Sequence, residues 1–179
     1  DGKDAVDFVG LTQTVDDFTF TWTEDDAEFL QPGLDRIRSF DAPVQTEMRV
    51  DLQTWLGEGQ FGTLDRADLV SPSYFVICDL KYGRGVPVDA VENKQLRLYG
   101  LGFINWLREN GHEIQEDARI LIIVDQPRHP QGGGEWEISI QELLAFGEEA
   151  KQAAWAASQP DAPRAPSLNA CRWCKLNKQ

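Results

Sequence analysis

The sequence predicts an α/β fold in which helices flank a central mixed β-sheet. Residues 44–52, VQTEMRVDL, alternate polar and apolar side chains, as a half-buried strand does. Residues 74–81 and 118–127 are almost continuously apolar, which is typical of strands buried on both faces. Apolar residues at helical spacing over 91–110 separate these two runs, so we expect a mixed sheet in which the middle strands are antiparallel and the fourth strand is reached by a helical crossover.

The remaining elements follow in order along the chain. DFTFTW, within residues 1–23, has β character. Residues 23–40 begin with a good N-cap and acidic residues, and Pro32 predicts a kink or two short helices there. A glycine-rich turn before 60–70 indicates a hairpin with the first strand, and a last helix is expected over 140–157.

The length of 179 residues suits one domain, which we place at residues 1–158. A Pro/Ala linker and a C-x-x-C tail follow over residues 159–179. No segment approaches the ~20 consecutive apolar residues of a membrane span, and no signal peptide opens the chain. We therefore expect a cytoplasmic protein without a membrane partner.

The formal net charge of −13 argues against a generic nucleic-acid-binding protein. Divalent cations held by carboxylates reverse such a charge locally, so the composition leaves room for a DNA-processing enzyme. Acidic residues also gather in the first 41 residues, in DGKDAVD and TEDDAE, where a solvated surface explains them.

The strand YFVICDLK ends in two charged residues of opposite sign. Period-two geometry puts Asp79 and Lys81 on one face, and the hairpin would place Asp65 beside Asp79. Two neighbouring carboxylates repel each other, which raises the pKa of one of them. A hard divalent cation such as Mg²⁺ or Mn²⁺ bound between them removes this repulsion. A lysine there would hold the scissile phosphate or stabilise developing charge. The simpler alternatives are a strand-end ion pair and a turn carboxylate.

Three further residues have both a functional and a structural interpretation. Gln95 and Tyr99 are four apart on the predicted helix and share a face that would point back at the site. For Tyr99 alone, packing on the sheet is the favoured interpretation. Glu47 lies on the polar face of its strand and is by default exposed to solvent.

Three segments in a fixed order, GTLDRAD, VICDLKYGRGVPV and ENKQLRLYGLG, resemble the PD-(D/E)XK nuclease superfamily in its RecB-like branch. Within that branch the chain is similar to a phage-encoded RecB-like family of unassigned function. The resemblance is close over residues 62–102 and extends in element order over 44–125. It implies a restriction-endonuclease-like core and, if the protein is phage-encoded, a place in the cytoplasm of a bacterial host.

The resemblance also implies roles for individual residues. Asp65 and Asp79 would bind Mg²⁺ or Mn²⁺, and Lys81 would be the catalytic lysine. Gln95 and Tyr99 match the helix motif of the branch, which supports the site and contacts DNA.

Other assignments are less specific. Glu47 falls where relatives carry an additional acidic ligand, ahead of the G-x-x-D strand. Arg84 and Lys94 belong to the loop after YFVICDLK, which is either a simple connection or a source of charge for the DNA backbone.

One departure from the branch concerns histidine. RecB-like relatives usually carry a metal-binding histidine on an upstream helix, but this chain has only His112 and His129, both downstream and in loop contexts. Either the original N-terminus is missing, which we favour, or the site has one ligand fewer.

A second departure concerns cysteine. Cys171 and Cys174 resemble part of the four-cysteine set that holds a 4Fe–4S cluster in many RecB-like nucleases. Half of a zinc site and a redox pair are alternatives. Unless a full-length chain supplies further cysteines, we favour two thiols in a frayed tail. Cys78 lies within an apolar strand and should pack as a small hydrophobic residue.

The sequence thus predicts a metal-dependent deoxyribonuclease, with exonuclease action favoured, that hydrolyses DNA phosphodiester bonds. Its partners would be DNA and helicase or recombination proteins, without a small-molecule cofactor. The first alternative is a DNA-binding or assembly module on the same fold that has lost turnover. The second is an iron–sulfur or zinc structural protein.

Overall fold

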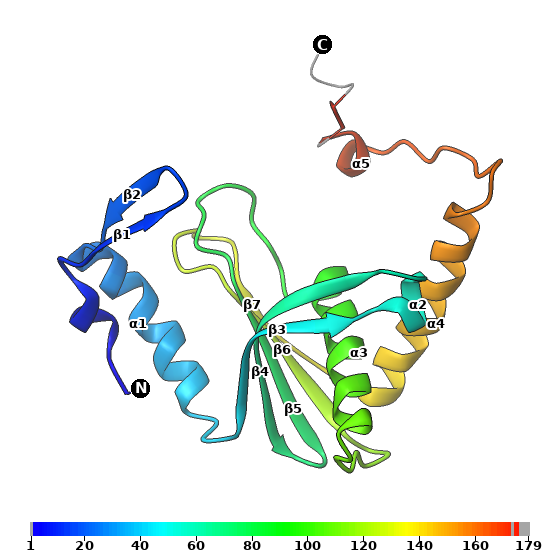
Figure 1. The fold of residues 1–179 in the computed structure, drawn as a ribbon, viewed down its shortest axis with the longest axis horizontal. Coiled ribbons are helices and arrows are strands. Elements are labelled where there is room, and N and C mark those ends of the chain that lie inside the picture. Colours follow the sequence, from blue (N-terminus) through cyan, green and yellow to red (C-terminus); the bar gives the residue numbers. More distant parts are fainter. Residues whose placement is uncertain (1, 173, 176–179) are drawn as a thin grey trace.

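The computed structural model describes residues 2–172, 174 and 175 (Figure 1). The N-terminal elements are a 3-10 helix η1 (Ala5–Phe8), the strands β1 (Thr12–Val15) and β2 (Phe18–Thr21), and the helix α1 (Glu24–Arg38). The central elements are β3 (Val44–Asp51), α2 (Gln53–Leu56), β4 (Phe61–Ser71), β5 (Tyr74–Leu80) and α3 (Lys94–Glu109). The chain continues with β6 (Arg119–Asp125), β7 (Gly134–Ser139), α4 (Ile140–Ala157) and α5 (Leu168–Arg172).

Five strands form one mixed sheet in the order β3-β4-β5-β6-β7. β5 and β6 are parallel and are joined through α3, whereas the other neighbouring strands are antiparallel. The predicted α/β class, the β3–β4 hairpin and the crossover are therefore confirmed. The most apolar of the early strands, β5, is also the central one, because a central strand is buried on both faces.

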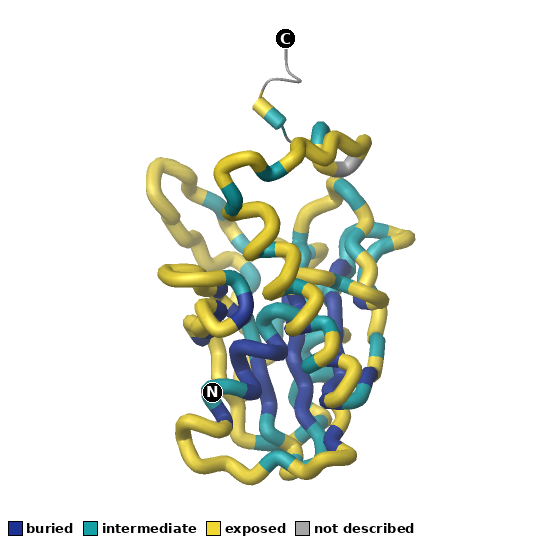
Figure 2. The backbone as a smooth tube through the Cα atoms, turned by 90° about the vertical axis from the view of Figure 1, so that its right-hand side faces the viewer, coloured by how far each residue is buried: buried dark blue, intermediate teal, exposed yellow. Residues whose placement is uncertain are grey.

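Helices cover both faces of this sheet (Figure 1). α3 packs across β3 to β6, and α4 packs against α3 and β7. The large core on this side includes Phe75 and Ile77 of β5 together with Phe103 of α3. On the opposite face, Val76 and Cys78 belong to a smaller cluster that Ile37 of α1 covers. Figure 2 shows that the buried backbone is concentrated in the strands of this sheet.

The helix boundaries follow from local chemistry. Thr23 caps α1 in a capping box with Asp26, as the sequence indicates. Of the two alternatives expected at Pro32, two short helices is wrong, because α1 runs as one helix through that proline, and a kink stays a prediction. Gly111 follows α3 with a φ of 76°, the left-handed conformation that glycine adopts without cost.

Two features at the chain ends lie outside the main sheet. β1 and β2 form a separate two-stranded hairpin next to α1, and the short helix α5 lies beyond the segment that follows α4 (Figure 1). Within the described part of the chain, none of the helices combines the length and the apolar character that crossing a membrane requires.

Candidate functional site

The candidate site begins where β5 ends. Asp79 continues the row of Phe75 and Ile77 that faces the α3 side, and Lys81 follows two residues later, as predicted. The Asp79 side chain is only 2% exposed, and its Oδ2 forms an ion pair with Nζ of Lys81. The lysine side chain is about one-third exposed, so the pair spans from the core to the surface.

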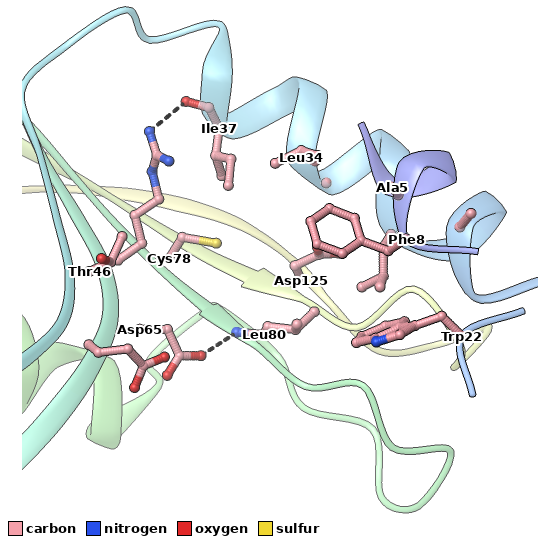
Figure 3. A pocket seen from close by; sticks show the side chains of 15 residues that line it. Ala5, Phe8, Trp22, Leu34, Ile37, Thr46, Asp65, Cys78, Leu80 and Asp125 are labelled. Atoms are coloured by element: carbon pink, nitrogen blue, oxygen red, sulfur yellow. Dashed lines mark hydrogen bonds between the residues drawn. The ribbon is translucent and has the colours of Figure 1, made fainter. Parts of the chain in front are cut away.

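Asp65 of β4 lies directly across from this pair. The regular pairing of β4 with β5 ends at Arg66 and Cys78, so Asp65 and Asp79 are the next residues on the two strands. The Oδ2 of Asp65 accepts a hydrogen bond of 2.8 Å from the backbone N–H of Leu80 (Figure 3). Asp65 lies in the middle of β4 and is held beside the end of β5 by this backbone hydrogen bond, next to Asp79 as the hairpin predicted.

Glu47 lies at the same level on β3. It sits between Thr46 and Met48, whose partners on β4 are the neighbours of Asp65 on either side. Glu47 has a φ of 49°, an uncommon conformation for a residue with a side chain. Its side chain is exposed, as its default interpretation predicts. Glu47 and Asp65 both line a cavity between α1 and the sheet, which is described below with Asp125.

Three carboxylates thus cross three adjacent strands at one level of the sheet. They do not converge: within residues 2–172, 174 and 175, no group of three or more His, Cys, Asp or Glu side chains is placed to hold a metal ion. The backbone brings these residues into one row, while their side chains have different neighbours.

The environment of Asp79 disfavours the charged form of its carboxyl group. Burial raises the pKa of Asp79, and the negative charge of Asp65 adds to that effect, while Lys81 opposes it. The buried Oδ2 also accepts no well-aligned hydrogen bond, so the ion pair with Lys81 is its main compensation. The predicted raising of a carboxylate pKa is found, although desolvation rather than the second carboxylate is its largest cause.

Gln95 and Tyr99, which were predicted to share a face of the helix, are hydrogen-bonded to each other within α3. Nε2 of Gln95 donates to the hydroxyl of Tyr99 at 3.0 Å. The Tyr99 ring lies against Gly62 of β4, where a Cβ would come within 2.2 Å of Cε1. Tyr99 therefore packs on the sheet, which confirms its structural interpretation, and DNA contact by this pair stays a prediction.

A buried amide that the sequence reading did not identify holds the loop after β5. Gln126 is 5% exposed, and its side chain accepts from the N–H of Val88 at 2.8 Å and donates to the carbonyl of Val86 at 3.0 Å. Arg84 is exposed on this loop, and Lys94 is exposed at the start of α3. The loop is thus a positioned segment, and contact of the two cations with DNA stays a prediction.

Asp125 is a second residue of the site that the sequence did not reveal. It ends β6 beside Leu80. It lines a cavity of about 530 Å³ between α1 and the sheet, together with Asp65 and Glu47 (Figure 3). Gly33 of α1 lies so close that a Cβ there would be 1.9 Å from Asp125 Oδ2. Burial raises the pKa of Asp125. The available signal was the run ILIIVD, which ends in aspartate just as VICD does.

A third feature connects α1 to the loop after β5. The Tyr82 hydroxyl donates to Asp26 of α1, and the Arg128 guanidinium lies 4.7 Å from the centre of the Tyr82 ring. Burial and the bond to Asp26 raise the pKa of Tyr82 to about 12. These contacts hold α1 against the loop after β5.

The cysteines have different surroundings. Cys78 is buried, and burial raises the pKa of its thiol to about 12, so it packs as the small hydrophobic residue that was predicted. Cys171 lies in α5, and the N–H of Cys174 donates to its carbonyl at 3.2 Å. The tail positions 173 and 176–179 are outside the described residues. A cluster or zinc role for the tail stays a prediction.

Comparison with known proteins gives a family and a similar solved structure. The structure is described as "Crystal structure of SSO0001" and shares 15% identity with this chain at a TM-score of 0.36. The match covers 84% of this chain and 66% of the other, so this chain spans just under two thirds of that protein. The sequence also matches, over residues 15–179, the family described as "Protein of unknown function (DUF2800)", and the chain belongs to that family.

Proposed function

We propose that this protein is a metal-dependent deoxyribonuclease of the RecB-like type, built on a restriction-endonuclease-like core. The observation that carries the proposal is the buried Asp79 at the end of β5, paired with Lys81 and lying across from Asp65. A buried carboxylate without a well-aligned hydrogen bond is costly, and such groups are concentrated at functional sites.

The chemistry of the carboxylates fits a hard divalent cation. Asp79 offers an oxygen that lacks a well-aligned hydrogen bond, and Asp65 offers the oxygen that is not bonded to Leu80. Carboxylate oxygens are the ligands preferred by Mg²⁺ and Mn²⁺. In this proposal Asp65 and Asp79 hold the metal, with Glu47 as a third candidate. When bound, such a metal would activate a water molecule for attack on the phosphorus.

The other residues would act on the substrate. Lys81 carries an ammonium group at the surface end of the pair, where it would stabilise the negative charge that develops on the phosphate. Gln95 would position substrate or lysine from α3, with Tyr99 as its support. Arg84 and Lys94 would contact the DNA backbone.

A second candidate is a DNA-binding or assembly module on the same fold. The ion pair favours it, because Lys81 is engaged by Asp79 instead of being available to a phosphate. The candidate predicts DNA binding without cleavage in the presence of Mg²⁺ or Mn²⁺.

Cleavage of end-labelled linear DNA tests the proposal directly. Single- and double-stranded substrates are incubated with Mg²⁺, Mn²⁺ or EDTA, and the wild type is compared with Lys81→Ala. We expect metal-dependent cleavage that falls by at least ~100-fold in Lys81→Ala, the usual cost of removing one charge-stabilising group. Lys151→Ala, on the exposed side of α4, is the matched control and should cleave normally. Intact DNA with either metal would contradict the nuclease proposal.

The wider expectations belong to the same proposal. Exonuclease action would appear as a ladder of short labelled products, whose order in time gives the polarity. A cytoplasmic location, helicase or recombination partners, and a tail cluster involving Cys171 and Cys174 follow from the RecB-like resemblance and stay predictions.

A further inference from the structure

The β1–β2 hairpin has two chemically different faces. One face carries four threonines, which form two cross-strand hydroxyl pairs: Thr12 with Thr21 at 3.0 Å and Thr14 with Thr19 at 2.9 Å. Such pairs are typical of a face exposed to water. This threonine face therefore needs no covering element.

The opposite face is mostly apolar and is here called the aromatic face. It contains the apolar residues Leu11, Val15, Phe18, Phe20 and Trp22 and one polar residue, Gln13, which pairs with Phe20. The Phe18 and Phe20 rings lie 6.4 Å apart, and the Phe20 and Trp22 rings 5.3 Å apart. Phe18 is 70% exposed, and Leu11 and Val15 are each more than half exposed. A contiguous exposed apolar patch of this kind marks an interaction surface.

The aromatic face continues into the cavity between α1 and the sheet. Trp22 and Phe8 both line that cavity (Figure 3), and Leu80 lies on its sheet side. The combined surface runs from the exposed Phe18 to an apolar hollow of about 530 Å³. An exposed apolar face that leads to a pocket suits an extended chain with one bulky apolar anchor.

The charge around the aromatic face is negative. Asp16 and Asp17 form the hairpin turn, and residues 1–41 contain eleven acidic and only three basic side chains. Two of those bases are engaged elsewhere, because Arg36 pairs with Glu135 and Arg38 pairs with Asp4. Like charges would oppose both a nucleic acid and a second copy of this chain at this surface.

We propose that the aromatic face and the adjoining cavity bind an extended, basic segment of another protein. Apolar side chains of the segment would cover Phe18 and Val15, one bulky side chain would enter the cavity at Trp22, and cationic residues would meet Asp16 and Asp17. β1 and β2 pair only with each other among the described strands, so each leaves an edge that an added strand can use. The cavity is shared with Asp65 and Glu47 of the proposed metal site, whereas the aromatic face itself lies outside that site.

The test uses a fluorescein-labelled eleven-residue peptide that alternates lysine with leucine and phenylalanine, measured by anisotropy with the full chain. Phe18→Ser combined with Val15→Ser should weaken binding at least ten-fold. Because both side chains are exposed, circular dichroism should stay unchanged. Asp16→Asn combined with Asp17→Asn leaves the aromatic face intact and should reduce the salt dependence of binding. The matched control, Thr14→Ser with Thr19→Ser, keeps the hydroxyls of the threonine face and should bind like the wild type.

Five outcomes would overturn the proposal. The peptide does not bind at all, or a scrambled peptide of the same composition binds equally well. The aromatic-face variant binds as the wild type does. Sedimentation shows that the wild type is a dimer and that the Phe18→Ser, Val15→Ser variant is a monomer, which assigns the surface to a second copy of the chain. A twenty-residue thymidine oligonucleotide displaces the peptide, which assigns the surface to DNA.

Discussion

Two ion pairs on adjacent strands have the same spacing and different environments. On β4, Arg66 and Asp68 are two residues apart, and at the end of β5 the same spacing separates Asp79 from Lys81, which directly follows the strand. Both aspartates are almost fully buried, at 0% and 2% exposure. The difference lies in how completely each carboxylate is satisfied.

The Arg66–Asp68 pair is fully bonded. The guanidinium donates to both carboxylate oxygens, at 2.8 Å and 2.7 Å, and also to the carbonyl of Ile37 in α1 at 3.1 Å. Such bidentate pairs are strong and geometrically specific. In contrast, Lys81 offers Asp79 a flexible ammonium at the surface, and Asp79 Oδ2 has no well-aligned hydrogen bond. We infer that the first pair fixes α1 to the sheet, whereas the second is available for chemistry.

The largest effect on stability is expected for Asp68→Asn. The substitution keeps the shape of the side chain but leaves the half-buried Arg66 without a counter-charge. We expect the free energy of unfolding to fall by about 3 kcal/mol, at the low end for breaking a buried ion pair. Urea denaturation followed by circular dichroism measures this change. A loss below ~1 kcal/mol would show that the pair is no more important than a surface salt bridge.

A smaller loss is expected for Lys81→Met, which keeps the length of the side chain. Asp79 loses its ion-pair partner, but it can respond by taking up a proton, and Lys81 is partly exposed. We expect a loss of about 1 kcal/mol at pH 7 that shrinks as the pH falls, because a protonated Asp79 needs no counter-charge. Urea denaturation at pH 7 and pH 4.5 gives both values. An equal loss at both pH values would point to lost packing instead.

Asp79→Asn is expected to raise the free energy of unfolding, in contrast to the two substitutions above. The raised pKa of Asp79 means that its ionised form is less stable in the folded state than in the unfolded state, so stability is lost as the pH rises through that pKa. An asparagine removes this penalty, and we expect a gain of about 1 kcal/mol at pH 7. The gain should vanish below about pH 4, where the aspartate is protonated in both states. Metal-free buffer with EDTA is required. Destabilisation at pH 7 would make Asp79 a structural residue like Asp68.

The parts of the candidate site that depend on the local periodicity of the strands could be predicted from the sequence. The shared face of Asp79 and Lys81 follows from the period of two, and the position of Asp65 follows from the hairpin. Asp125 and Gln126 were missed, because their environments arise from α1 and from the loop after β5, which are far away in sequence. The Arg66–Asp68 pair has a spacing like that of the candidate site, so only the tertiary contact with Ile37 reveals its role.

The smallest expected effect concerns Cys78, which lies between the two pairs. It is opposite Arg66 in the register and adjacent to Asp79, and its thiol has a pKa of about 12, chiefly because it is buried. In a Cys171→Ser, Cys174→Ser background, alkylation by iodoacetamide should therefore be very slow at pH 8. Asp79→Asn removes one of three nearby negative charges, and we expect the rate to rise by no more than a few-fold, since burial is unchanged. A rise of ~100-fold or more would show that Asp79→Asn has exposed Cys78 by loosening the end of β5. The effect of Asp79→Asn on stability could then not be compared with that of Asp68→Asn.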